Sequence, residues 1–175
     1  TTPQLVDLSK ETKSTLDLYG IGGKDSDKHG RACLLARKLS ESGVRFVQVT
    51  MDGWDHHGDI QGNLPRLCQQ TDQPIAGLLK DLKQRGLLDD TIILWTTEFG
   101  RMPSSQGGKG RDHNPYCFTN WLAGGGIKGG VSYGPSDDFG YKPQDRKNPT
   151  QVYDIHATIL HLLGIDHTLL NVRNN

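Results

Sequence analysis

The sequence predicts an α/β fold, a doubly wound and mostly parallel sheet with helices on both faces. Apolar, strand-like runs alternate along the chain with segments whose apolar residues recur at helical spacing. One of these runs, TIILWTT at 91–97, is apolar almost throughout, as expected of a strand that is buried on both faces of a parallel sheet. A length of 175 residues suits a single domain over residues 1–175.

The elements of the N-terminal half follow from periodicity and from signals at their ends. A first helix is expected over 25–42, followed by a buried strand at 44–50, whose sequence VRFVQVT is rich in β-branched and aromatic residues. A second helix is expected over 64–86, and Pro74 should kink or divide it. The strands at 44–50 and 91–97 are then expected to be parallel neighbours, with the 64–86 segment as their crossover connection.

The C-terminal half contains more glycine and weaker signals. CFTNWLA at 117–123 is a further strand candidate, and the glycine-rich run 124–130 that follows is interpreted as a turn. The last helix is expected over 154–164, with Asp154 as its N-cap and Gly164 at its end.

Composition excludes several classes of partner. The chain carries 20 basic and 20 acidic residues, so it has no electrostatic footprint for nucleic acid or for an anionic membrane. No run approaches the roughly 20 apolar residues of a membrane span, and the first residues do not form a signal peptide. Cys33, Cys68 and Cys117 form no metal-binding clip, and their spacing leaves free thiols or one disulfide open.

Three polar clusters follow the apolar runs, at 51–59, 98–101 and 110–114. Carboxylates and imidazoles at the C-terminal ends of neighbouring strands are what a metal-assisted hydrolytic site in an α/β fold requires. Asp52 and His56 form a ligand pair that rivals Asp55 and His57. The candidate groups in the three clusters are Asp52, Asp55, His56, His57, Asp59, Glu98, Asp112 and His113.

Each cluster also has an explanation that needs no metal. Asp55 and His57 can form a hydrogen-bonded loop pair, and the third cluster can cap a turn before its Asn-Pro step. Glu98 can form an exposed salt bridge, which contributes little, with Arg101 or Arg111. Taken jointly and in their order, the clusters favour a metal site or its remnant.

Five motifs, in their order along the chain, resemble the C-terminal half of a mostly secreted, sulfatase-like family of the alkaline phosphatase superfamily. They are DGWDHHGD, TTEFGR, GRDHNPY, WLAGGGIKGG and DIHATILHLLGID. The resemblance covers nearly the whole chain from about Lys24 and implies an alkaline-phosphatase/sulfatase-like fold that is incomplete here. It also implies a periplasmic or secreted location and bound divalent metal ions, usually zinc, manganese or calcium.

The resemblance assigns roles position by position. Asp55 and His57 correspond to ligands of the first metal ion, and His113 corresponds to a downstream histidine that returns to it. Glu98 corresponds to a carboxylate ligand of the second metal ion. Phe99 stands where the superfamily has a ligating histidine, so the second site lacks a usual ligand.

The predicted function follows from these roles. Arg101 and Arg111 are suited to bidentate recognition of a sulfate or phosphate group. The superfamily nucleophile is expected upstream, so this chain is interpreted as the C-terminal part of a metallohydrolase that acts on small-molecule or glycan esters of sulfate or phosphate. Its partner is then the remainder of the parent chain, and little turnover is expected without it. The alternative is a degenerate, non-catalytic scaffold that binds a partner or an anionic glycan. A third and weaker hypothesis is a hydrolase that uses a different, single-metal chemistry.

Overall fold

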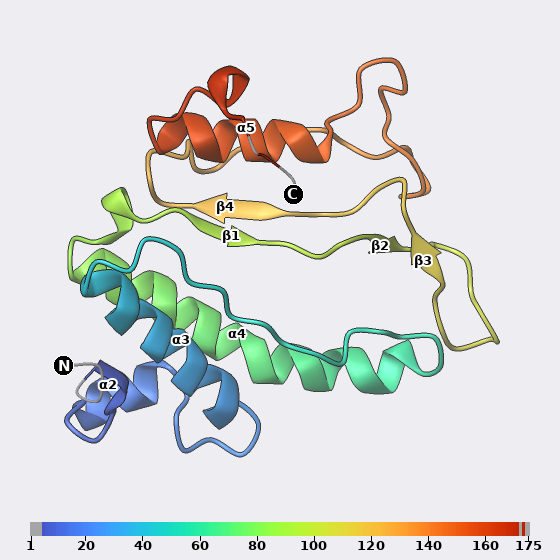
Figure 1. The fold of residues 1–175 in the computed structure, drawn as a ribbon. Coiled ribbons are helices and arrows are strands. Elements are labelled where there is room, and N and C mark those ends of the chain that lie inside the picture. Colours follow the sequence, from blue (N-terminus) through green and yellow to red (C-terminus); the bar gives the residue numbers. More distant parts are fainter. Residues whose placement is uncertain (1–4, 172, 174–175) are drawn as a thin grey trace. The chain divides into compact units, whose positions relative to one another are not determined.

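The structure is a computed structural model that describes residues 5–171 and 173. It divides into two compact units: Thr1–Thr91 with Ser105–Asp112, and Ile92–Ser104 with His113–Asn175. The helices are α2 (Lys13–Leu18), α3 (Asp27–Glu41), α4 (Ile60–Gln84) and α5 (Val152–Leu162), with 3-10 turns η1 (Leu88–Asp90) and η2 (His167–Leu169) (Figure 1). The strands are β1 (Ile93–Trp95), β2 (Gly100–Arg101), β3 (His113–Asn114) and β4 (Trp121–Ala123).

The first unit is helical, and α3 packs along α4 in it (Figure 1). Its core is built on Tyr19, Cys33 and Leu34, which are at most 3% exposed. A Cβ added at Gly77 of α4 would lie 2.6 Å from the Leu18 carbonyl oxygen. Glycine therefore allows the backbone of α4 to lie against the end of α2.

A buried network of charges joins the same helices. Arg37 is 3% exposed and lies 3.0 Å from a carboxylate oxygen of Asp81, 2.7 Å from Glu41 and 3.3 Å from Glu11. The Tyr19 hydroxyl donates a hydrogen bond to Asp81 at 2.9 Å. Burial and the neighbouring Asp81 carboxylate raise the pKa of Tyr19 above its usual value of 10.0. The ion pairs offset the cost of burying these charges, although the buried Arg37 Nε makes no hydrogen bond with any described residue.

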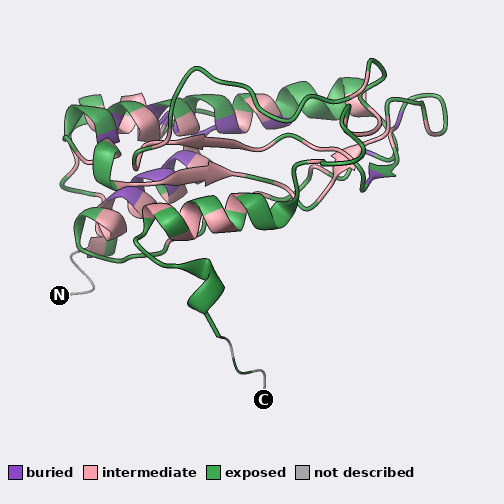
Figure 2. Ribbon diagram, turned by 90° about the horizontal axis from the view of Figure 1, so that it is seen from above, coloured by how far each residue is buried: buried purple, intermediate pink, exposed green. Residues whose placement is uncertain are grey.

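The second unit contains two small antiparallel sheets and α5. In one sheet β1 pairs with β4, and Trp95 lies opposite Trp121; in the other β2 pairs with β3, and Arg101 lies opposite His113. In the described part of this unit Asn114 is the one buried residue, whereas the first unit holds the other buried side chains (Figure 2).

The prediction of a doubly wound, mostly parallel sheet is wrong. In the described residues the structure has helices and two antiparallel sheets of two strands each. The segment 44–50 is irregular, with a bend at Arg45, and forms no strand, and Phe46 in it is 81% exposed. Strand-forming residues make a strand only when a neighbouring segment supplies a ladder. Within the run at 91–97, three residues form strand β1, which pairs antiparallel with the later β4. The helix α4 is therefore not the crossover of a parallel strand pair.

The helix predictions are confirmed, with corrections at their ends. The segment 25–42 forms α3, and 64–86 forms most of α4, which begins at Ile60 and runs unbroken through Pro74. The last helix begins at Val152, and Asp154 is its third residue instead of its N-cap. Its carboxylate accepts the backbone N–H of Gln151 at 2.7 Å, which completes a capping box. No helix in residues 5–171 and 173 is both long and apolar enough to cross a bilayer.

Candidate metal centre

Two loops of the first unit meet at the start of α4, and backbone hydrogen bonds join them. The Asp59 side chain accepts the backbone N–H of Gly62 at 3.2 Å, which caps α4. The Ile60 backbone N–H donates to the Lys109 carbonyl at 3.1 Å, and the Arg111 N–H donates to the His56 carbonyl at 2.9 Å. These bonds fix the loop 55–59 against the segment 105–112.

Gly110 makes this close approach possible. A Cβ added there would overlap the backbone carbonyl of His57. Gly110 also pairs with Gln106 in both directions, since its N–H donates to the Gln106 carbonyl at 2.8 Å and its carbonyl accepts the Gln106 N–H at 2.9 Å. This bridge forms a tight hairpin whose arm carries Gln106 to His57.

The imidazole of His57 lies among three polar side chains of the first unit. Its Nε2 lies 3.0 Å from Asp55 Oδ1, its Nδ1 lies 2.7 Å from Gln106 Oε1, and Nδ1 lies 3.9 Å from Asp112 Oδ1. The His57 side chain is 39% exposed and that of Asp55 is 68% exposed, so an ion from solvent can reach both. The ring therefore has distinct environments at its two nitrogens.

His113 is positioned by the second unit, in β3. It lies opposite Arg101 of β2, so the two side chains and that of Phe99, two residues before Arg101, share one face. The Phe99 and His113 rings stack, with centroids 4.0 Å apart and planes at 28°. The Arg101 guanidinium carbon lies 5.9 Å from the centroid of the Phe99 ring.

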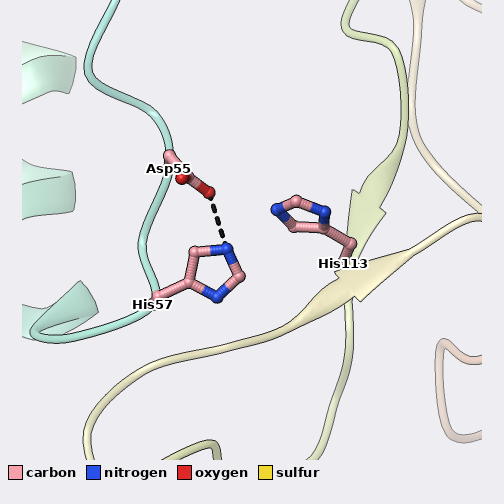
Figure 3. Close-up of side chains that lie close together, drawn as sticks. All are labelled: Asp55, His57 and His113. Atoms are coloured by element: carbon pink, nitrogen blue, oxygen red, sulfur yellow. Dashed lines mark ion pairs between the residues drawn. The ribbon is translucent and has the colours of Figure 1, made fainter.

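Asp55, His57 and His113 form a group that could hold a metal ion. Each offers one ligand atom, and these atoms all lie within 4.8 Å of one another (Figure 3). His113 directly follows Asp112, which lies beside His57, so a single peptide bond connects it to the loops that carry the other two ligands.

The donor set and spacing fit a transition metal. Ligand atoms of a tetrahedral zinc ion lie about 3.3 Å apart, given metal–ligand distances of about 2.0–2.1 Å. The 3.0 Å between Asp55 Oδ1 and His57 Nε2 is close to that value. The ligand atoms of all three residues lie within 4.8 Å of one another. Three protein ligands with a fourth position left for water or substrate is the usual composition of a catalytic zinc site.

The other predicted metal ligands lie outside this group. Among the described residues Glu98 does not belong to the three-residue group, and it is exposed in the bend before β2. The rival pair of Asp52 and His56 is also outside the group, and His56 is 4% exposed. Arg111 donates from its guanidinium to the Gly110 carbonyl at 2.9 Å, so this side chain also supports the hairpin.

Sequence reasoning missed two residues of the site. Gln106 contacts His57 but lies outside the polar clusters, and nothing in its local sequence marks it. Gly110 begins the third cluster, yet its importance comes from a backbone contact with a loop about 50 residues earlier in the chain. Only the small size of the residue, in a glycine-rich stretch, hints at such a contact.

Two of the three comparisons with known proteins are negative. Neither the curated proteins nor the solved structures yield a match to the chain. The third matches a family over residues 1–175, and its description, protein of unknown function, names no activity. The resemblance to a sulfatase-like family therefore stays a prediction. The match spans the whole sequence, and the chain belongs to the DUF1501 family.

Proposed function

We propose that the chain holds a divalent metal ion with Asp55, His57 and His113, and that this centre serves hydrolysis of sulfate or phosphate esters. The observation that carries the proposal is the convergence of the three ligand atoms within 4.8 Å. Two imidazole nitrogens and one carboxylate oxygen favour zinc or manganese over calcium, which prefers oxygen ligands.

The residues of the chain have separate roles in this proposal. Asp55, His57 and His113 hold the ion. A bound divalent ion supplies a Lewis acid that polarises a non-bridging oxygen of the ester and offsets charge in the transition state. Arg101 and Arg111 carry guanidinium groups, and each of these can donate two parallel hydrogen bonds to a sulfate or phosphate group.

Glu98 enters only as a ligand of a second metal ion, and only the resemblance supports that role. A second candidate function is a metal-binding scaffold without catalysis, which binds a partner or an anionic glycan. Phe99 favours this candidate, because it stands where the resemblance expects a metal-binding histidine and its ring instead packs on His113.

Metal titration of the purified, metal-free chain tests the proposal. We expect one zinc or manganese ion per chain by calorimetry and elemental mass spectrometry. His57→Ala and His113→Ala should each weaken binding at least a hundredfold, whereas His156→Ala, at an exposed position of α5, should leave it unchanged. Equal affinity in all four proteins would overturn the site. Metal-dependent turnover of an aryl sulfate or aryl phosphate by this chain would favour the hydrolase. Because the resemblance places the nucleophile upstream, the scaffold is favoured only if turnover is also absent in a longer protein that carries such a segment.

A further inference from the structure

We infer that Gln106 is a positioning residue that fixes the tautomer of His57 and thereby selects Nε2 as its metal-binding atom. The inference rests on the proposed metal centre and concerns a residue outside the three ligands. Its basis is the 2.7 Å contact between His57 Nδ1 and Gln106 Oε1.

The two nitrogens of a neutral imidazole cannot play the same role. One carries the proton and donates, and the other has a lone pair that accepts or binds a metal ion. The Gln106 oxygen can only accept a hydrogen bond, so His57 Nδ1 must carry the proton when it makes this contact. The Asp112 carboxylate, 3.9 Å from Nδ1, favours a proton there, and the Asp55 carboxylate, 3.0 Å from Nε2, competes for one on Nε2. With the proton on Nδ1, the lone pair is on Nε2.

Nε2 faces the other ligand of the first unit. It lies 3.0 Å from Asp55 Oδ1, and both are acceptors when His57 is the neutral Nδ1–H tautomer. Two acceptors at this distance repel each other unless a proton or a cation lies between them. A divalent ion satisfies both atoms at once, so the Gln106 contact prepares this pair to bind one.

The backbone keeps Gln106 in place independently of its side chain. Its N–H and carbonyl both pair with Gly110, at 2.9 and 2.8 Å. A substitution of the side chain leaves these two bonds intact, so the hairpin and its contact with the loop 55–59 should be retained. The role of the amide oxygen can therefore be tested without unfolding the site.

The test uses three variants of the whole chain. Gln106→Leu removes the acceptor, Gln106→Glu keeps an acceptor oxygen, and Gln69→Leu makes the same change at an exposed position of α4. Zinc affinity is measured by calorimetry for each. We expect Gln106→Leu to weaken zinc binding about 10- to 100-fold, the range found for outer-shell partners of metal-ligating histidines. Gln106→Glu and Gln69→Leu should bind within about threefold of the unsubstituted chain.

A second measurement separates this role from a general structural one. Long-range ¹H–¹⁵N NMR of the metal-free protein, at a pH where the ring is neutral, reports the tautomer of His57 directly. We expect Nδ1–H in the unsubstituted chain and in Gln69→Leu, and loss of that preference in Gln106→Leu. An Nε2–H tautomer in the unsubstituted chain would overturn the inference whatever the zinc affinities are.

The outcomes distinguish the inferred role of Gln106 from the proposed metal centre on which it rests. If the unsubstituted chain binds no metal ion, the proposed centre fails and the inferred role falls with it. If it binds zinc and Gln106→Leu binds equally well, the centre stands and only the role of Gln106 is rejected.

Discussion

The rings of Phe99 and His113 stack with their centroids 4.0 Å apart and their planes at 28°. Phe99 stands where the sequence resemblance expects a metal ligand, and a phenyl ring cannot ligate. The structure gives the side chain another role, because the stack fixes the plane of a ring that offers a ligand atom to the three-residue group. Phe99 thus helps to orient a candidate ligand instead of binding a metal ion itself.

This relationship predicts the effect of Phe99→Ala. An aromatic pair contributes about 0.5–1.5 kcal/mol beyond its buried area, so its loss should weaken zinc binding by roughly two- to tenfold. Calorimetric titration measures the change. Phe99→Tyr keeps the ring and should retain the affinity of the unsubstituted chain. A full loss of affinity in Phe99→Tyr, or none in Phe99→Ala, would contradict the role of the stack.

Gly110→Ala should disrupt the hairpin that carries Gln106 and Arg111. The added Cβ would overlap the backbone carbonyl of His57, and neither backbone can yield without breaking the hydrogen bonds that join the two loops. We expect a loss of about 1–3 kcal/mol in the free energy of unfolding, measured by urea denaturation, and weaker zinc binding.

Gly58→Ala is the matched control for that substitution. A Cβ at Gly58 meets no other atom within 4 Å, and the residue is the next one after His57. It should change the unfolding free energy by less than about 0.5 kcal/mol. Equal changes of the unfolding free energy in Gly110→Ala and Gly58→Ala would show that the backbone moves to relieve the clash at Gly110.

The helices could be predicted from the sequence because their signals are local. The periodicity of 25–42 and 64–86 and the glycine after each helix depend on nearby residues, and α3 and α4 formed where expected. The sheet could not be predicted in the same way. Whether 44–50 becomes a strand depends on a partner segment, and whether β1 pairs parallel or antiparallel depends on which distant segment supplies its ladder.

The site was predicted in part for a similar reason. Asp55, His57 and His113 belong to types that bind metal ions and occur in compact motifs, so their chemistry was visible in the sequence, and the structure groups them. The predicted edge of a parallel sheet was not what brought them together. A glycine contact and a short hairpin instead hold the loop that carries Asp55 and His57, and neither leaves a periodic pattern.

The buried charges of the first unit predict a large cost for Arg37→Met. The substitution leaves the carboxylates of Asp81 and Glu11, which are 7% and 14% exposed, without this partner. Breaking a buried ion pair on one side costs about 3–5 kcal/mol, and Asp81 keeps Arg85 at 2.7 Å, so we expect about 3 kcal/mol by urea denaturation. Lys13→Met, in a pair whose side chains are 86% and 58% exposed, should cost less than about 0.5 kcal/mol. Similar costs in both variants would contradict the importance of burial.

Cys33 should be the least reactive thiol of the folded chain. All three cysteines are free in the structure, and Cys33 is buried in the core beside Leu34. Burial raises the pKa of Cys33 to about 12, so almost none of it is the reactive thiolate at pH 8. Iodoacetamide followed by peptide mass spectrometry should label Cys68 and Cys117, which are partly exposed, before Cys33. In urea all three should react at similar rates, and early labelling of Cys33 in the native protein would show that the core opens.

Protonation of the Asp137 carboxylate in acid should weaken the turn that follows this residue. The Asp137 carboxylate accepts backbone N–H groups from Tyr141 at 2.9 Å and Lys142 at 3.2 Å, and these bonds hold its pKa below the usual 3.8. A carboxyl whose pKa is lower in the folded state adds stability above its unfolded pKa, and this stability is lost as the pH falls through the folded value. Asp137→Asn should therefore destabilise the protein at pH 7 relative to the unsubstituted chain, and the difference should shrink below about pH 4. Thermal unfolding of both proteins from pH 7 to pH 3 measures this, and NMR titration of the Asp137 carboxyl carbon measures the pKa itself. A titration midpoint at or above 3.8, or a difference that grows in acid, would show that these backbone hydrogen bonds do not stabilise the charged form.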